Sequence, residues 1–250
     1  MEIRCTQCGA AVEVAPDVRL LACPYCETAL VVDGSRVLFR EALRPTVDPA
    51  EAPAHLRRFL AGTRTVAGLD REARIGDPEM VWFPFWAFTV AAGEGEQVEL
   101  MPAAPSSLQG LQGLELPAGS TQKVVPELER LGKIVEPEIP VETARTWLAE
   151  RHGGEAPVRR TVLYHLPLYR MTYAWRGRDY RAAVDAVTGR VFPAEYPAKA
   201  EAPYRLVLAL ALLVFGLEGL VVRDILVKLA LYLVSVPPIL GVAWFVSRKV

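Results

Sequence analysis

The hydrophobic pattern of the chain is dominated by two long apolar runs near its C-terminus. One covers Leu206–Val222 and the other Ile225–Val246, with two charged residues between them. A helix of about 20 apolar residues crosses the roughly 30 Å hydrocarbon core of a bilayer, so each run has the length of a span, the first with Tyr204 and Arg205 as interfacial anchors. Neither run keeps the polar face typical of a soluble helix. The pattern predicts a transmembrane helical hairpin over residues 203–247.

A few polar and helix-breaking residues interrupt these runs and leave a buried hairpin in a soluble domain as the alternative. Glu218 lies about one turn from Arg223, and Lys228 lies near the start of the second run. Both side chains can reach one interface or pair there, so we interpret them as residues of the hairpin end, with an ion path as the other possibility. The pair Pro237-Pro238 is expected to kink or break the second helix.

Two similar stretches precede the apolar runs. Residues 50–60 and 141–151 have helical hydrophobic patterns, and each is followed by an aromatic-rich strand pattern. The cores of these strands are Phe-Pro-Phe-Trp at Pro84 and Leu-Pro-Leu-Tyr at Pro167, an offset of 83 in residue number. We expect an α+β domain over residues 35–200, built from two helix-plus-antiparallel-sheet units (about 45–131 and 132–200). Because proline cannot donate to a ladder, each strand should have an edge or a bulge at its proline.

Strand patterns also flank these two units. A short strand is expected at Arg36–Arg40, and Ala174–Phe192 has the pattern of a three-stranded meander with glycine turns. The clustered aromatic residues could contact peptide or lipid, but their alternation along strands favours a hydrophobic core.

All four cysteines lie close to the N-terminus, between Met1 and Cys26. They form two pairs, Cys5 with Cys8 and Cys23 with Cys26, in the pattern C-x2-C-x14-C-x2-C. Two residues between cysteines form a tight turn that aims both thiolates at one metal, and two such turns complete a tetrahedral site. Strands at residues 12–14 and 19–22 are expected around a turn at residues 15–17. The spacing predicts a zinc ribbon over residues 1–34, with Zn²⁺ held by the four thiolates and providing most of its stability.

The same four cysteines could serve other chemistries. Disulfides fit a cytosolic chain poorly. Cys-Pro-Tyr-Cys matches the active-site tetrapeptide of glutaredoxins, but a strand pattern follows it where those proteins have a helix. Iron in a rubredoxin-like centre uses the same four ligands and stays open, although rubredoxins carry aromatic residues in the spacer and this chain has none there.

The charge of the chain limits the kinds of partner that it can bind. The chain of 250 residues has a net charge of −1, and residues 1–34 hold two arginines against five acids. Binding to nucleic acid needs clustered Lys and Arg, so the ribbon is expected to contact protein or to be purely structural.

The first residues lead directly into the cysteines without an apolar run, which predicts no signal peptide. Positive residues flank the outer ends of the hairpin and predict the inner, cytoplasmic membrane with both termini in the cytoplasm. The basic stretch at residues 157–205 would favour anionic headgroups there.

The leading C-x2-C-G…C-P-x-C motif, the P-[FL]-[WY] strands and the Y-x-A-x-V-D-A-x-T-G-x-V rhythm together support a resemblance. The chain resembles uncharacterised bacterial zinc-ribbon membrane proteins, and its last sheet resembles PepSY-type domains. The likeness covers the architecture from end to end, but only the cysteines are specific. It implies a ribbon, a PepSY-like α+β region and a membrane hairpin. It also implies partners of the flotillin-like or phage-shock, membrane-stress type.

Catalysis finds little support in the sequence. His55, His152 and His165 are scattered, and the chain contains no nucleophile elbow, phosphate loop or H-E-x-x-H motif. We therefore expect a non-enzymatic adaptor that binds an unidentified protein partner at the membrane, without a small-molecule substrate. A membrane-tethered electron-transfer protein is the alternative, and a nucleic-acid-linked regulator is a weaker one.

Overall fold

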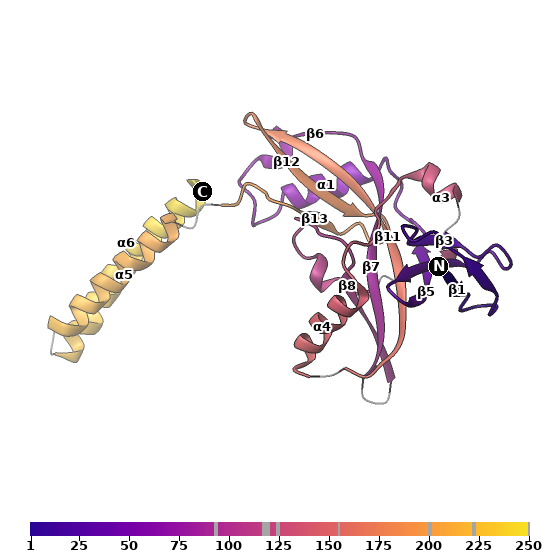
Figure 1. Cartoon of the computed structure of the whole chain (residues 1–250). Coiled ribbons are helices and arrows are strands. Elements are labelled where there is room, and N and C mark those ends of the chain that lie inside the picture. The colour runs from indigo at the N-terminus through magenta and orange to yellow at the C-terminus, as the bar shows by residue number, and fades with distance from the viewer. Residues whose placement is uncertain are drawn as a thin grey trace. The chain divides into compact units, whose positions relative to one another are not determined.

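The protein is an α+β chain with an N-terminal cysteine-bearing pair of hairpins, a mixed β-sheet with helices, and two C-terminal helices (Figure 1). The structure, a computed structural model, describes residues 1–92, 95–116, 121–123, 126–154, 156–199, 202–221 and 224–249. The strands are β1 (Glu2–Arg4), β2 (Ala11–Glu13), β3 (Leu20–Ala22), β4 (Ala29–Asp33), β5 (Arg36–Leu43), β6 (Arg74–Ile75), β7 (Glu79–Ala92), β8 (Gly95–Pro102), β9 (Thr121–Lys123), β10 (Lys133–Ile134), β11 (Val158–Trp175), β12 (Arg178–Asp185) and β13 (Val191–Pro193). The helices are α1 (Ala52–Leu60), α2 (Leu69–Glu72), α3 (Pro126–Leu131), α4 (Val141–His152), α5 (Ala202–Val221) and α6 (Ile225–Lys249), with a 3-10 turn η1 (Leu111–Gly113).

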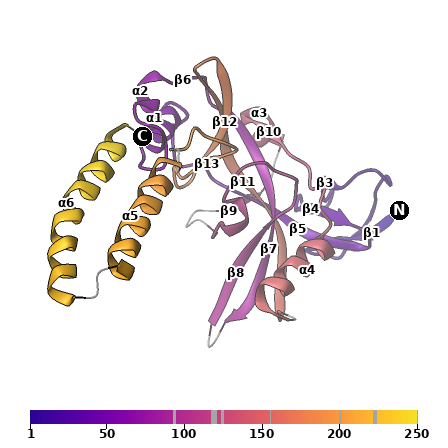
Figure 2. The same ribbon diagram turned by 90° about the vertical axis from the view of Figure 1, so that its left-hand side faces the viewer.

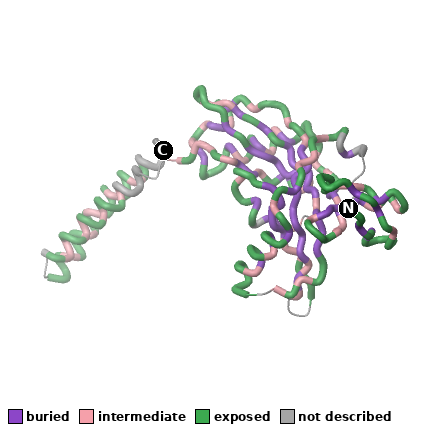
Figure 3. Tube along the Cα trace, in the orientation of Figure 1, coloured by how far each residue is buried: buried purple, intermediate pink, exposed green. Residues whose placement is uncertain are grey.

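Two long antiparallel strands, β7 and β11, form the centre of the larger sheet (Figure 2). Successive residues of β7 point to opposite faces, and both faces are covered: Phe83 and Phe85 belong to one buried cluster, and Trp86 and Phe88 belong to another. This explains the unbroken apolar sequence of the strand, because burial on both faces removes the usual alternation. The interpretation of the aromatic residues as core is confirmed, and buried positions follow both strands in Figure 3.

The two strand prolines lie at matching points of this central pair. Besides β11, strand β7 pairs with β10 before Pro84 and with β8 after it. Besides β7, strand β11 pairs with β5 before Pro167 and with β12 after it. The prediction of an edge strand or a bulge at each proline is therefore wrong. Both strands are central, and their register with each other is regular at the prolines. The missing N–H falls in the gap between two neighbouring strands. Each proline carbonyl still accepts a bond, from Ala103 N at 3.0 Å and from Ala186 N at 2.9 Å.

Further contacts repeat with the offset that relates Pro84 to Pro167. Trp86 Nε1 donates to Ile139 O at 2.8 Å, and Tyr169 OH donates to Val47 O at 2.7 Å. Each acceptor lies in the segment that leads into a helix, α4 after Ile139 and α1 after Val47. An aromatic side chain two positions after each proline thus holds the entry to a helix.

The parallel partners of the two strands also correspond. Lys133 of β10 lies opposite Val81 of β7, and Glu41 of β5 lies opposite Tyr164 of β11. The central-strand positions again differ by 83 in residue number, and the partner positions differ by 92. The helices are exchanged between the halves, because α1 packs on β12 and β13 while α4 packs on β8 (Figure 1).

The predicted meander and several local elements are present. β11, β12 and β13 follow one another antiparallel, with positive φ at Gly177 (75°) and Gly189 (72°) in the connecting turns. β5 is longer than the expected strand at Arg36–Arg40. Residues 1–60 and 70–196 form one compact unit, and residues 61–69 and 197–250 form a second.

The two strands expected around one turn in the cysteine region belong to different hairpins. The expected strands at residues 12–14 and 19–22 do not pair with each other: β2 pairs with β1, and β3 pairs with β4. Each hairpin therefore encloses one cysteine pair at its tip. β4 continues through β5 into the larger sheet, so the predicted ribbon boundary at residue 34 falls in a turn between two strands of that sheet.

The C-terminal helices α5 and α6 pack side by side (Figure 2). The segment Ile225–Trp244 of α6 is long and apolar enough to cross a membrane, whereas the apolar segment of α5, Val207–Leu220, is shorter. α6 continues as a helix through Pro237 and Pro238, so the expectation of a break is wrong.

Candidate metal centre

The four cysteine sulfurs form a compact cluster at the tips of the two N-terminal hairpins. All four Sγ atoms lie within 4.8 Å of one another. Cys5 Sγ lies 3.7 Å from Cys26 Sγ, and Cys8 Sγ lies 3.8 Å from Cys23 Sγ. A tetrahedral site with zinc–sulfur bonds of about 2.3 Å has sulfur–sulfur edges of about 3.8 Å. The cluster therefore fits a four-thiolate metal ion such as zinc and is consistent with a zinc ribbon.

The two cysteine turns have the same backbone construction. Gly9 N donates to Cys5 O at 2.9 Å, and Glu27 N donates to Cys23 O at 2.8 Å. The residue after each second cysteine is left-handed, with φ of 74° at Gly9 and 59° at Glu27. Glycine adopts this conformation at low cost, whereas glutamate carries strain. Both turns therefore require a left-handed residue, although only the first has glycine there.

Polar groups near the sulfurs support thiolate character. Gln7 N donates to Cys5 Sγ at 3.4 Å, and Thr28 Oγ1 lies 3.3 Å from Cys26 Sγ, where its hydroxyl can donate to a thiolate. Hydrogen bonds from the Thr28 side chain and then from its backbone N–H lower the pKa of Cys26 to about 6. Thr28 was missed in the sequence, where only its place two positions after a cysteine could have indicated it.

The pKa of Cys8 moves in the other direction. The Ala10 backbone N–H has the largest effect and lowers this pKa, but desolvation together with the other three cysteines raises it to about 12. A second thiolate so close to the first is costly without a positive charge between them. A metal ion supplies that charge, so the cluster can bind metal only by releasing protons.

A cleft of about 510 Å³ opens beside the cluster. Its lining includes Cys26 and Thr28 and the charged residues Arg40, Glu41 and Arg160. Arg160 Nη2 pairs with Glu41 Oε1 at 3.2 Å. The cleft beside Cys26 thus contains charged side chains.

The three histidines lie on different elements. The ring of His55 on α1 packs against Gly189, and His165 on β11 is buried. Burial, and secondarily the charge of Arg40, lowers the pKa of His165 to about 3, so this side chain is neutral near pH 7. The burial of His165 is consistent with a packing role in the core.

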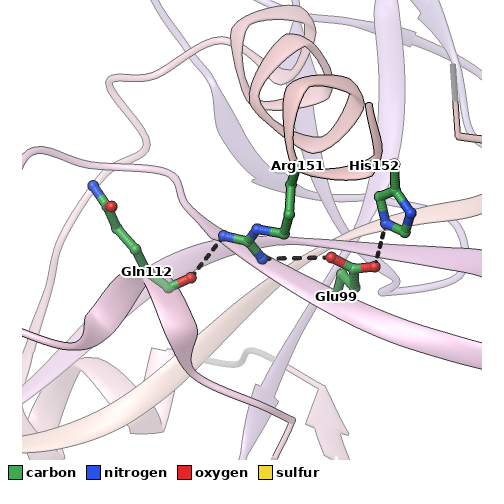
Figure 4. Close-up of polar contacts among 4 residues, drawn as sticks. All are labelled: Glu99, Gln112, Arg151 and His152. Carbon is green, nitrogen blue, oxygen red and sulfur yellow. Dashed lines mark hydrogen bonds and ion pairs between the residues drawn. The ribbon is translucent and has the colours of Figure 1, made fainter. Parts of the chain in front are cut away.

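His152 takes part in a polar cluster that the sequence did not indicate (Figure 4). Its Nε2 lies 2.5 Å from Glu99 Oε1, and the adjacent Arg151 contacts Glu99 Oε2 at 3.4 Å and donates to Gln112 O at 2.8 Å. Glu99 comes from β8, and its side chain is 10% exposed. The cluster connects the C-terminal end of α4 to β8. At this end of the helix the positive charge of Arg151 also interacts favourably with the helix dipole.

The polar residues of the C-terminal helices make contacts between α5 and α6. Lys228 Nζ donates to Gly219 O at 3.0 Å, and Ser235 Oγ donates to Glu218 Oε2 at 3.2 Å. The suggested partner of Glu218, Arg223, lies outside the described residues. Glu218 and Lys228 thus each contact the opposite helix.

Comparisons with models of protein families, with curated proteins and with solved structures found no match. The site therefore has to be interpreted from its own geometry.

Proposed function

We propose that this protein is a membrane-anchored cytosolic zinc-ribbon adaptor that binds protein partners at the inner face of the membrane. The observation that carries the proposal is the cluster of four sulfurs at tetrahedral spacing on hairpins poor in basic residues. Such a ribbon cannot neutralise many phosphates, which favours a protein over a nucleic acid as its partner. A binding role also accords with the histidines, since each is engaged in packing or in an ion pair.

Zinc fits the proposed role of the centre. Cys5, Cys8, Cys23 and Cys26 would hold the ion, and the metal would cross-link the hairpin β1–β2 to the hairpin β3–β4. Chain contacts hold the two hairpins unequally. β3–β4 pairs with β5 of the larger sheet, and Arg19 Nη1 donates to Pro137 O at 2.9 Å, whereas β1 and β2 pair only with each other among the described strands. Ile3 and Val12 of the first hairpin also share a small buried cluster with Leu30 of β4. The metal adds to this contact and is needed more by β1–β2 than by β3–β4, a narrower role than the whole-ribbon stability expected from the sequence.

The anchor in this proposal is the pair α5 and α6, crossing as a hairpin over residues 203–247 with both termini cytoplasmic. The apolar segment Ile225–Trp244 supports a span, and the contacts of Lys228 and Ser235 with α5 support a paired hairpin. α5 has 20 residues, which is about the length of a span. Partners of the membrane-stress type suit this location and are part of the proposal.

The test joins metal content to partner capture. The full chain is extracted from native membranes in mild detergent, its metal is measured, and stoichiometric partners are identified by mass spectrometry. Cys8→Ser should lose the metal and the partner together. Gln7→Ala is the matched control, because the exposed side chain is removed while the backbone N–H to Cys5 remains. Partner capture that survives metal loss would remove the ribbon from the proposal.

One observation favours a second candidate, a membrane-tethered electron-transfer protein with iron in the same site. Cys8 is exposed and Cys26 is half-buried, which leaves ligand sulfurs accessible to a redox partner. Ferric thiolate absorbs visible light and zinc thiolate does not. A red purified protein with one iron per chain would replace the adaptor proposal by this one.

A further inference from the structure

The hairpin β3–β4 extends the larger sheet by pairing with β5. Side chains of this hairpin and of the turn that follows it contact one group of residues, which we call the first seat: Trp86, Pro137, Val141 and Leu163. Val31 of β4 shares a buried cluster with Trp86, Val141 and Leu163. Arg19 donates to Pro137 O at 2.9 Å. The first seat thus takes an apolar strand and one arginine.

Asp33 completes the contact at the start of α4. Its Oδ2 accepts from Val141 N at 2.8 Å. The N-terminal residue of this helix, Pro140, offers no side-chain cap, so a carboxylate from another segment satisfies the free amide.

The internal repeat places an equivalent surface on the other half of the sheet. The offset of 83 relates Trp86 to Tyr169 and Leu163 to Met80. The segments that lead into α4 and α1 differ by 92 in residue number, as do β10 and β5. This offset relates Pro137 to Pro45 and Val141 to Pro49. Hydrogen bonds support these equivalences, since Trp86 and Tyr169 each bind a carbonyl in the segment before a helix, and the two acceptors, Ile139 and Val47, also differ by 92. We call Pro45, Pro49, Met80 and Tyr169 the second seat.

The second seat is an open cavity of about 530 Å³, and all four of its residues line it. Leu131 also lines it and is 60% exposed. The contrast with the first seat is clear at the prolines: Pro137 is buried, whereas Pro45 is half-buried and Pro49 is exposed. An apolar cavity therefore lies where the other half of the sheet holds the hairpin β3–β4.

The cavity of the second seat has a carboxylate of its own in its lining. Asp48 belongs to the cavity wall, and its Oδ1 already accepts from Ala50 N at 2.8 Å before α1. Pro49, the counterpart of Val141, has no N–H, so the second seat needs no carboxylate from outside. A cation fits it, since Asp48 adds negative charge and Pro45 stands where Pro137 accepts from an arginine.

We propose that the second seat binds an apolar β-hairpin segment of a partner protein that carries an arginine, in the manner in which the first seat holds β3–β4. The inference deepens the proposed adaptor function, on which it rests, by naming the surface that receives the partner and the chemistry of the received segment. The hydrophobic contact supplies affinity, and the arginine sets the orientation.

The test uses the methionine methyl groups of the full chain in detergent micelles. Met80 lines the cavity, while Met101 and Met171 are buried elsewhere and serve as internal references. The probe is a synthetic cyclic β-hairpin whose strands copy residues 19–22 and 29–33. In ¹³C-methyl NMR titrations we expect a saturable shift of the Met80 signal and unchanged signals from the two references. Replacing the peptide arginine by alanine should weaken binding about tenfold.

Variants of the protein make the test specific. Leu131→Lys should abolish the Met80 response, because it places a cation at the rim of the cavity. Val18→Lys is the matched control, since Val18 is an exposed apolar residue of the ribbon and should leave the response unchanged. A Met80 signal that ignores the peptide up to millimolar concentration, or that responds equally in Leu131→Lys, would overturn the proposal.

Other occupants give distinct results that also overturn it. A Met80 shift that grows with protein concentration alone would indicate a second copy of the chain, and one produced by lipid bicelles alone would indicate an acyl chain. The titration needs neither a natural partner nor bound metal. A failed titration therefore removes only this surface, whereas failed partner capture removes the adaptor function.

Discussion

Replacement of Gly9 by alanine tests whether metal binding depends on the left-handed residue after each cysteine pair. Gly9 has φ of 74°, and a methyl group added there would meet no atom within 4 Å. The substitution therefore changes backbone conformational energy without a steric clash. Glu27 has the equivalent position in the second turn with φ of 59°, so Glu27→Gly is the opposite experiment.

The magnitude follows from two opposing effects. A left-handed conformation costs an alanine about 1–2 kcal/mol. Loss of glycine freedom in the unfolded chain returns about 0.4–1 kcal/mol. The net cost is about 1 kcal/mol, which corresponds to about a fivefold weaker metal affinity if the turn is ordered only with metal bound. Glu27→Gly removes strain from a turn in the hairpin that β5 holds without metal, so it should change zinc affinity less than Gly9→Ala does.

The assay is competition for zinc against a chromophoric chelator at pH 7, with the full chain in detergent. Gly177→Ala is the matched control, since Gly177 has φ of 75°, also has open space around its Cα, and lies in the β11–β12 turn away from the cysteines. It should lower the thermal midpoint by about 2–4 °C while leaving zinc affinity unchanged. Zinc affinity of Gly9→Ala within twofold of the parent would refute the reasoning, as would an equal loss in Gly177→Ala.

Further outcomes are expected from other contacts. Asp33→Ala should cost about 1 kcal/mol of unfolding free energy in denaturant titration, and Asp33→Asn clearly less, because the amide oxygen can still cap α4; equal losses would contradict the capping role. Gly189→Ala should be more destabilising than Gly177→Ala, since its φ is 72° and the new methyl would also overlap the ring of His55. Its expected cost is about 2–3 kcal/mol, of which His55→Ala should restore only the steric part in a double-mutant cycle. Zinc affinity should rise with pH, because binding displaces protons, and its loss on acidification should steepen below about pH 6, where Cys26 becomes protonated. Thr28→Val should move that steepening to higher pH, since it removes the hydrogen bond that lowers the pKa of Cys26. Removal of metal should accelerate amide exchange in β1–β2 and leave β3–β4 protected, and equal exchange in both hairpins would contradict the unequal support.

The pairing of the cysteine region shows where sequence reasoning reaches its limit. The residues of β2 and β3 were expected at nearly their observed positions on either side of one turn, but each strand pairs with another strand, β2 with β1 and β3 with β4. Strands as short as these carry too little pattern to select a partner. Each hairpin instead closes around its own cysteine pair, so that all four sulfurs meet at the tips.

The strand prolines show a second limit. A missing N–H at Pro84 and Pro167 is a local fact, and from it an edge or a bulge was a sound expectation. Which strand lies beside each proline depends on contacts between residues far apart in the chain. At Pro84 one neighbouring strand ends and the next begins, and this arrangement leaves no local signal in the sequence.

The sequence by itself determined the local features of this protein: the spacing of the four cysteines, the apolar C-terminal runs, the glycine turns of the meander and the repeat of the proline-centred strands. These are short-range properties that follow from residue type and period. Only the tertiary structure decided that α1 and α4 pack on each other's half, that Asp33 caps a distant helix, and that one of two equivalent seats holds the hairpin β3–β4 while the other is open. Those features arise because burial rewards contacts between distant segments, and sequence separation carries no record of which segments will meet.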